Sequence, residues 1–250
     1  MMQTKRFFKQ VGLLGVVPQR NFRAAVILSG CGVYDGSEIT ESVSLLIALS
    51  KNGASYQVFA PNIDQAHVVN HTDGSEMPAK RNVLQESARI ARGNVKDLAT
   101  LNASDFDAVL LPGGFGAAKN LSDFAFKGDG MTVNDQVEKA LKAFHSEKKV
   151  IGLACIAPVV AARVFGTKFG GPGVTLTLGS KGDKWPYNGS IDVAKGFGNT
   201  LVEKQLSEVC IDEAHKVYST PAYMRDDAKP HEIYEGIEAM VRAIARSLKK

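Results

Sequence analysis

The fold is decided at Val150-Ile-Gly-Leu-Ala-Cys-Ile-Ala-Pro158, where an unbroken apolar run ends abruptly in a cysteine. A short apolar run without alternating polar residues is typical of a parallel strand that helices cover on both faces. Residues 156–165 have the pattern of a helix, so the chain passes from strand to helix almost without a loop. Such a junction forces its residue into a strained, outward-pointing position. We therefore predict that Cys155 lies on a tight turn at the carboxyl end of a buried strand.

The same alternation continues outward from this stretch. Apolar runs predict strands, and segments of helical periodicity lie between them: strands at 24–28, 56–60, 108–111, 174–178, 208–211 and 216–219, and helices at 39–50, 82–92, 133–148 and 233–248. This order predicts an α/β, doubly wound, mostly parallel sheet with helices on both faces. Sites in such folds lie at the carboxyl ends of the strands. The glycine-rich stretch 179–198, which carries Trp185, is predicted to be a surface excursion.

Composition excludes several classes of protein. The 250 residues include 44% hydrophobic and 22% charged residues, which fits one soluble domain over 24–250. The net charge of +4 is mild, and no apolar run approaches the ~18 residues of a membrane span. The three cysteines and five histidines lack the spacing of a disulfide framework or a metal site. No dinucleotide or phosphate-binding glycine motif is complete. We expect no metal, cofactor, nucleic-acid partner or membrane partner.

Residues 1–23 differ from the rest of the chain. They contain five basic residues and no acidic one, and the basic residues interleave with apolar ones. This pattern resembles a mitochondrial transit peptide, which predicts localisation to the mitochondrial matrix. The alternative is a disordered basic tail on a cytoplasmic protein.

Two loops give Cys155 the beginnings of a site. At a helix N-terminus the macrodipole favours a thiolate, which would make the cysteine a nucleophile. Gly113 and Gly114 follow a neighbouring strand, and their backbone N–H groups, with that of Ile156, are predicted to form an oxyanion hole. The alternatives are an inert buried cysteine and a simple strand-to-helix turn that needs glycine.

A carboxylate is expected beside the cysteine. Glu38 and Glu41 are one turn apart at the start of the first helix, so they share a face. A buried carboxyl group with a raised pKa is suited to general acid–base chemistry. Glu41 is preferred for this role because apolar residues flank it, whereas Glu38 suits a cap or a contact with substrate.

Longer motifs carry a resemblance to a known family. They are Leu28-Ser-Gly-Cys-Gly-Val-Tyr-Asp-Gly-Ser-Glu38, Arg81-Asn-Val-Leu84, Ala88-Arg-Ile-Ala-Arg-Gly93, Pro112-Gly-Gly-Phe-Gly-Ala-Ala-Lys-Asn-Leu-Ser122, Cys155-Ile-Ala-Pro158 and Thr220-Pro-Ala-Tyr-Met224. From about residue 23 to its end, the chain resembles the ThiJ/PfpI branch of the class I glutamine amidotransferase-like superfamily. More specifically, it resembles the bacterial ElbB (enhancing lycopene biosynthesis) proteins and their mitochondrial glutamine amidotransferase-like relatives.

The resemblance implies a flavodoxin-like fold, a homodimer, Cys155 as the nucleophile and Glu41 as the carboxylate that hydrogen-bonds it. Some relatives are described as glyoxalases, which convert glyoxal or methylglyoxal to hydroxy acids without glutathione, or as protein deglycases. Many relatives have a histidine directly after the nucleophile, where this chain has Ile156. A Cys–His–Glu triad is therefore not predicted, and an ammonia-producing amidotransferase subunit is disfavoured.

The sequence thus predicts a glyoxalase-type enzyme that acts on a small aldehyde or a glycated substrate. The alternative is a non-enzymatic protein that senses redox state or binds a metabolite or partner. Lys119 and Asn120 are candidates for substrate binding. These two residues and Arg81, Asn82, Arg89 and Arg92 are assigned either to an anionic substrate or to structural ion pairs. A small apolar pocket at Cys155 would favour glyoxal-sized substrates, and a basic pocket would favour larger anions.

Overall fold

The structure is a computed structural model that describes residues 22–249. Seven strands form one sheet in the order β3-β2-β1-β4-β5-β9-β8, and β6 and β7 pair separately in parallel. In the large sheet only β8 is antiparallel to its neighbour. The predicted doubly wound, mostly parallel sheet is therefore confirmed. The strands are β1 (Arg23–Ile27), β2 (Ser55–Ala60), β3 (Val95–Asp97), β4 (Ala108–Leu111), β5 (Val150–Ala154), β6 (Thr175–Leu176), β7 (Thr200–Leu201), β8 (Cys210–Asp212) and β9 (Val217–Thr220).

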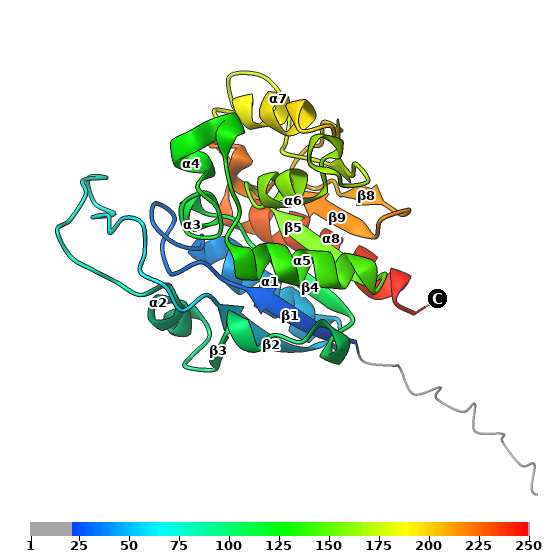
Figure 1. The fold of residues 1–250 in the computed structure, drawn as a ribbon, viewed down its shortest axis with the longest axis horizontal. Coiled ribbons are helices and arrows are strands. Elements are labelled where there is room, and N and C mark those ends of the chain that lie inside the picture. The colour runs from blue at the N-terminus through cyan, green and yellow to red at the C-terminus, as the bar shows by residue number, and fades with distance from the viewer. Residues whose placement is uncertain (1–21, 250) are drawn as a thin grey trace, which may run out of the picture.

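Helices cover both faces of the sheet (Figure 1). In that view α5 lies in front of the central strands, and α1 and α8 lie behind them, packed against each other. The helices are α1 (Ile39–Lys51), α2 (Val83–Ile90), α3 (Phe115–Lys119), α4 (Phe124–Lys127), α5 (Asp135–Ser146), α6 (Pro158–Phe165), α7 (Gly189–Gly196) and α8 (Pro230–Ser247). Short 3₁₀ turns occur at η1 (Leu98–Thr100), η2 (Ala103–Asp105), η3 (Gly128–Gly130), η4 (Thr167–Phe169) and η5 (Ala222–Met224).

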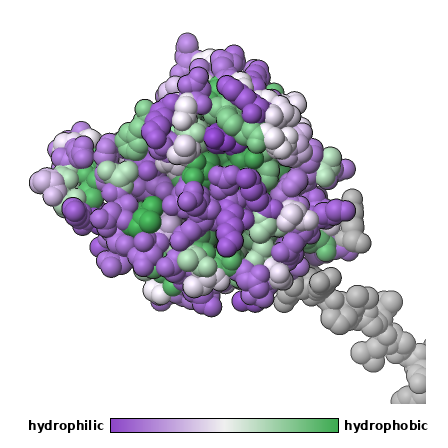
Figure 2. All heavy atoms as spheres, viewed as in Figure 1, coloured by the Kyte–Doolittle hydropathy of each residue, from purple (hydrophilic) through white to green (hydrophobic). Residues whose placement is uncertain are grey.

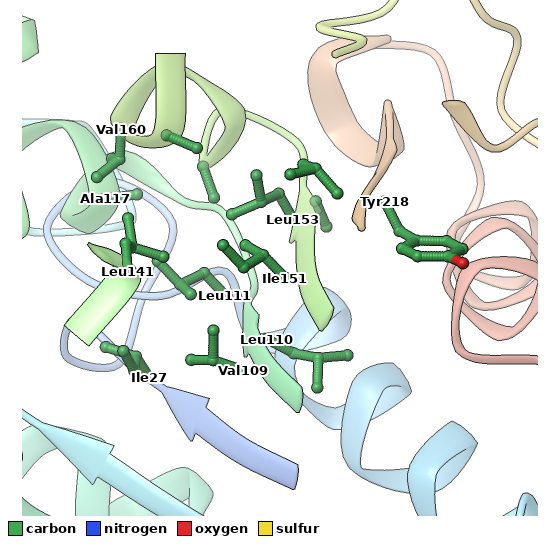
Figure 3. Close-up of a cluster of buried hydrophobic side chains, with 14 of the residues drawn as sticks. Ile27, Val109, Leu110, Leu111, Ala117, Leu141, Ile151, Leu153, Val160 and Tyr218 are labelled. Carbon is green, nitrogen blue, oxygen red and sulfur yellow. The ribbon is translucent and has the colours of Figure 1, made fainter. Parts of the chain in front are cut away.

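The central strands are apolar throughout because both of their faces are packed. Every residue of β4 and β5 is buried. Leu111 and Ile151 lie between the sheet and the helices that carry Leu141 and Val160 (Figure 3). Burying a side chain of this size contributes about 1.5–3 kcal/mol, so these strands hold the centre of the molecule in place. Much of the face in front of the sheet is hydrophilic, with hydrophobic residues gathered in patches (Figure 2).

Two predicted segments differ from the structure. The stretch 179–198 is not only a surface excursion, because it contains α7 and the buried Trp185. The helix predicted from residue 156 begins at Pro158, because the chain first turns through Cys155. In the described range 22–249, no helix is both long and apolar enough to cross a membrane. The basic segment 1–23 falls almost wholly outside that range.

The topology brings three chain segments together. From β1 the sheet grows one way to β2 and β3 and the other way to β4 and β5. The connections that follow β1, β4 and β5 therefore meet at one edge, outside the carboxyl ends of the strands. They carry the start of α1, the glycine pair Gly113–Gly114, and Cys155.

Candidate active site

Cys155 occupies the turn between β5 and α6 in a left-handed conformation. Its φ is +59°, a region that costs a residue with a side chain about 1–2 kcal/mol. The Cys155 N–H donates to the carbonyl of Thr220 at 3.0 Å, which ties the turn to the end of β9. The surrounding structure thus holds the strained turn, and the side chain leaves the strand at the sheet edge, as the sequence predicts.

Glu41 lies beside this cysteine with no exposed surface. Its Oε2 accepts the N–H of Gly113 at 2.8 Å, and its Oε1 accepts the N–H of Tyr223 at 3.2 Å. The carboxyl group also shares a hydrogen bond with the Cys155 thiol. Three chain segments therefore fix Glu41 against the sulfur, and the predicted cysteine–carboxylate pair is present.

Glu38 has a different task from Glu41. Its carboxylate accepts the N–H of Glu41 at 2.6 Å and so caps the N-terminus of α1. The N–H of Glu38 donates to the carbonyl of Gly113 at 3.1 Å. Glu38 therefore both starts the helix that carries Glu41 and joins that helix to the glycine loop. Its side chain also reaches the wall of the cavity described below.

Position 113 in the loop after β4 requires glycine because Cys155 and Glu41 lie directly against it. A Cβ on Gly113 would come within 2.4 Å of the Cys155 Cβ and 2.8 Å of Glu41 Oε2. The Gly113 N–H is already donated to Glu41, so it does not belong to an oxyanion hole, and the predicted set is revised accordingly. The backbone N–H groups of Gly114 and Ile156 point at the Cys155 sulfur. These two donors can stabilise negative charge on the sulfur or on an oxygen bonded to a carbon beside it.

Burial controls the protonation of the pair. Burial and the negative charge of Glu38 together raise the pKa of Glu41 to about 7, against the hydrogen bonds of its carboxylate, which lower it. Burial and then the charge of Glu41 raise the pKa of the Cys155 thiol well above its ordinary value. The expected low-pKa thiolate is therefore not found, because two N–H donors and a helix terminus do not outweigh burial beside a carboxylate. The resting thiol is neutral, and Glu41 is placed to take its proton.

A cavity of about 310 Å³ opens onto the cysteine. Cys155, Ile156 and Gly114 form part of its wall, and most of the remainder is apolar or aromatic: Val33, Phe115, Ala118, Phe124, Ala125, Pro186, Tyr187, Gly189, Ser190, Tyr223 and Met224, with Glu38. Sequence reasoning missed the aromatic lining. Tyr223 lies in the motif Thr220-Pro-Ala-Tyr-Met224, which carries part of the family resemblance. Tyr187 falls in the stretch 179–198, which the sequence predicts to be a surface excursion, and no local pattern marks Tyr187 as part of a site.

Two other predicted binding residues, Lys119 and Asn120, form structural hydrogen bonds. Asn120 is buried and donates to the carbonyls of Ser29 and Asp35, both at 2.9 Å. Lys119 donates to the carbonyl of Tyr34 at 2.9 Å and does not line the cavity. These hydrogen bonds hold the loop between β1 and α1.

The arginines near α2 form ion pairs instead of a binding site. Arg89 bonds Glu86 at 2.8 Å, and Arg81 approaches the same carboxylate at 3.9 Å. Asn82 caps α2, and Arg92 is exposed just beyond its end. Among residues 22–249, no three histidine, cysteine or acidic side chains are grouped to hold a metal ion.

The chain is similar in sequence to curated mitochondrial proteins. The chain is 49% identical over 232 residues to the human glutamine amidotransferase-like class 1 domain-containing protein 3, mitochondrial, a match that covers 91% of this chain and 84% of that protein. No protein-family model matches the chain. The relative's name confirms the mitochondrial localisation that residues 1–23 predict, while the matrix stays a prediction.

Solved structures agree with the fold. A crystal structure of an isoprenoid biosynthesis protein with an amidotransferase-like domain, from Ehrlichia chaffeensis, superposes with a TM-score of 0.81 at 33% identity over 91% of this chain and 99% of that chain. DJ-1beta from Drosophila melanogaster superposes with a TM-score of 0.50 at 21% identity, over 91% of this chain and 97% of that one. The second likeness bears on the fold alone.

Proposed function

The chain belongs to the family of mitochondrial glutamine amidotransferase-like class 1 (ES1) proteins, and from that premise we propose that it is a cysteine-dependent enzyme of the glyoxalase type. The substrate is an α-oxo aldehyde, which is converted to the hydroxy acid without glutathione. One observation carries the proposal: at the wall of a cavity, the Cys155 thiol lies against the buried Glu41 carboxyl group, which two backbone N–H groups hold in place, and burial raises the pKa of that carboxyl to about 7. Such a pKa suits a group that must both accept and return a proton near neutral pH.

The residues support a sequence of balanced steps. Glu41 takes the thiol proton as the Cys155 sulfur bonds to the aldehyde carbon, and the N–H groups of Gly114 and Ile156 stabilise the oxyanion until Glu41 returns that proton to it, which gives a hemithioacetal. Glu41 then removes the proton from that carbon and returns it to the neighbouring keto carbon, while the hydroxyl proton of the hemithioacetal passes to the keto oxygen, which leaves a thioester. Water cleaves the thioester to the hydroxy acid and restores the thiol. The net reaction adds one water, and no external oxidant or reductant is required.

The alternative functions find less support in this geometry. Peroxide attacks thiolates that are accessible, whereas Cys155 is 7% exposed and its pKa is raised. This disfavours a redox sensor. Glutamine hydrolysis is disfavoured because no histidine lines the cavity within the described residues. Binding of a metabolite without turnover is the second candidate, since it needs the cavity alone.

The proposal is tested with recombinant protein and methylglyoxal in the absence of glutathione. We expect lactate to form, Cys155→Ala to abolish its formation, and Glu41→Gln to reduce it by about 10²-fold or more. Cys31→Ala is the matched control because Cys31 does not line the cavity, and it should keep full activity. Turnover that survives Cys155→Ala would end the proposal, and binding without turnover in the unaltered protein would favour the second candidate.

A further inference from the structure

The cavity is larger than glyoxal or methylglyoxal requires. Its volume of about 310 Å³ falls at the low end of the range of about 300–1,000 Å³ found for pockets that enclose drug-sized ligands. Each water occupies about 30 Å³ of liquid volume, so the space corresponds to about ten waters. Methylglyoxal has only five non-hydrogen atoms and leaves most of this space to water. The cavity therefore has room for a substantial group attached to the reacting carbons.

The wall of the cavity includes four aromatic side chains. Phe115, Phe124, Tyr187 and Tyr223 all contribute to it. Phe115 and Tyr187 meet edge to face, with their ring centroids 5.7 Å apart. Aromatic rings prefer such contacts with other rings, and each pair contributes about 0.5–1.5 kcal/mol beyond the area that it buries. The wall is thus suited to a flat or bulky apolar group.

The charges of the site reject anions. Glu38 lines the cavity and Glu41 lies behind the cysteine, while no lysine or arginine of the described chain forms part of the wall. A carboxylate or phosphate on the substituent would lose its water, meet no lysine or arginine side chain in the wall, and be repelled by Glu38. The hydroxy acid product carries a carboxylate, so the same charges favour its release.

We propose that the substrate is an α-oxo aldehyde with an uncharged apolar substituent about the size of a phenyl ring, an inference that rests on the proposed function. Phenylglyoxal is the model compound. It gains one water to give mandelate, as its aldehyde carbon is oxidised and its keto carbon is reduced. The aldehyde carbon meets the Cys155 sulfur, and the ring lies among Phe115, Tyr187 and Tyr223.

Kinetics on matched substrates test the selectivity. We expect kcat/KM for phenylglyoxal to exceed that for methylglyoxal by at least tenfold, and to exceed that for 4-carboxyphenylglyoxal by at least tenfold. Ala125 is an exposed residue on the cavity wall, and Ala125→Trp should fill the space and bring the phenylglyoxal-to-methylglyoxal ratio close to one. Ala99→Trp, also at an exposed alanine but away from the cavity, should leave the ratio unchanged. A wild-type ratio of one or less, or equal turnover of the carboxylated ring, overturns the inference and leaves the proposed function standing.

Binding to the Cys155→Ala variant separates the cavity from the chemistry. Trp185 is the chain's single tryptophan and directly precedes Pro186 and Tyr187 of the wall, so its fluorescence reports occupancy. Cyclohexyl methyl ketone, which is apolar and cannot be turned over, should give a saturable change, and 4-acetylcyclohexane carboxylate should not. If the ketone binds while the unaltered protein turns over no aldehyde, the proposed function fails but the apolar selectivity of the cavity is upheld. If the ketone does not bind, the inference fails.

Discussion

Cys155 and Glu41 act on each other's protons, and this mutual effect governs the chemistry of the site. Each is buried. Burial and the charge of Glu38 raise the pKa of Glu41, whereas its hydrogen bond with Cys155 lowers it, and burial and the charge of Glu41 raise the pKa of the Cys155 thiol. The two groups therefore do not ionise together, and the first proton leaves the pair near pH 7. That proton comes from Glu41, because its pKa lies below that of the thiol. A site of this kind starts from a neutral thiol and makes its nucleophile only as the thiol proton is transferred.

The pH dependence of turnover follows from this order. Below pH 7 the Glu41 carboxyl is protonated and cannot take the thiol proton, whereas above pH 7 it is ionised and can. We therefore expect kcat/KM for methylglyoxal to rise about tenfold per pH unit below pH 7 and to level off above it. Glu41→Gln cannot ionise, so its residual activity should lack this inflection. The pH profile from 5 to 9 measures both, and the same inflection in the variant would contradict the assignment.

Glu38 provides a finer check on the same carboxyl. Its negative charge raises the pKa of Glu41, so Glu38→Gln should move the inflection to lower pH. The amide still offers an oxygen to the Glu41 N–H, which keeps a cap on α1. An inflection that stays in place would show that another group controls the profile.

At the scale of elements, the loop after β4 packs against both Cys155 and Glu41 of α1. Gly113→Ala places a Cβ within 2.4 Å of the Cys155 Cβ, so the loop or the cysteine must move. A displacement of about 1 Å in a reacting group can lower activity by about 10²-fold, and we expect a loss of that order. Gly130→Ala is the control, because a Cβ there meets no atom within 4 Å. Circular dichroism establishes that both variants fold, and full activity in a folded Gly113→Ala protein would refute this role of the loop.

The end of α5 forms an acid-sensitive contact with the β8–β9 hairpin. The centroid of the His145 ring lies 5.8 Å from that of His215 and 4.8 Å from that of Phe165. The Nδ1 of His215 is in turn 2.9 Å from Asp212 Oδ2. Burial, followed by the charge of His215, lowers the pKa of His145, and Asp212 offsets this only in part. The unfolded chain therefore binds a proton at His145 more readily than the folded protein does. This contribution to stability is complete above about pH 6.5 and is lost as the pH falls through the folded pKa.

Removing His145 should therefore flatten the acid side of the stability curve. We expect His145→Phe to lose less free energy of unfolding between pH 7 and pH 5.5 than the unaltered protein, as measured by urea denaturation. His231 is exposed at the start of α8, and His231→Phe should leave the difference unchanged. An equal loss in the His145 variant and the unaltered protein would contradict the assignment.

The elements differ in how far the sequence predicts them. The bounds predicted for β4 and for the strand before Cys155 match the structure, because a strand packed on both faces must be apolar at every position. The pair of Cys155 and Glu41 could also be predicted from the sequence, because each lies at the end of a helix or strand with a clear hydrophobic pattern. The aromatic wall could not, because Phe115, Tyr187 and Tyr223 come from three distant segments that only the fold brings together. The sequence left Lys119 and Asn120 between substrate binding and a structural role, because nearness to a glycine loop does not reveal where a side chain points.

For the whole molecule, the strand order explains how so few residues make a site. The reversal of direction at β1 leaves space between the connections that follow β1 and β4. Into that space the chain places the cap of α1, the glycine loop and the turn at Cys155. Hydrogen bonds from Glu38 N–H to the Gly113 carbonyl and from Gly113 N–H to Glu41 join the first two, and the turn is held to the end of β9. Residues 186–190 and 223–224 complete the cavity wall, and Tyr223 supplies the second N–H for Glu41. One sheet and the connections between its strands are thus enough to assemble the pair, its donors and its cavity.

The outer face of α1 predicts how the molecule associates. Ile39, Val43 and Ile47 are 48%, 40% and 45% exposed and lie four residues apart, so they form a stripe along one side of the helix. A contiguous apolar stripe in water is typical of a contact surface, and a second copy of the chain is the occupant that the family resemblance implies.

We therefore predict a homodimer through α1, with a mass by light scattering twice that of one chain. Around a two-fold axis each substitution occurs twice in the interface, so Val43→Lys brings two charges into an apolar contact and should give monomers. Ile211→Lys, at a comparably exposed position (42%) on the edge strand β8, is the control and should remain dimeric. A monomeric unaltered protein would refute the dimer, and a dimeric Val43→Lys protein would place the contact elsewhere than on α1.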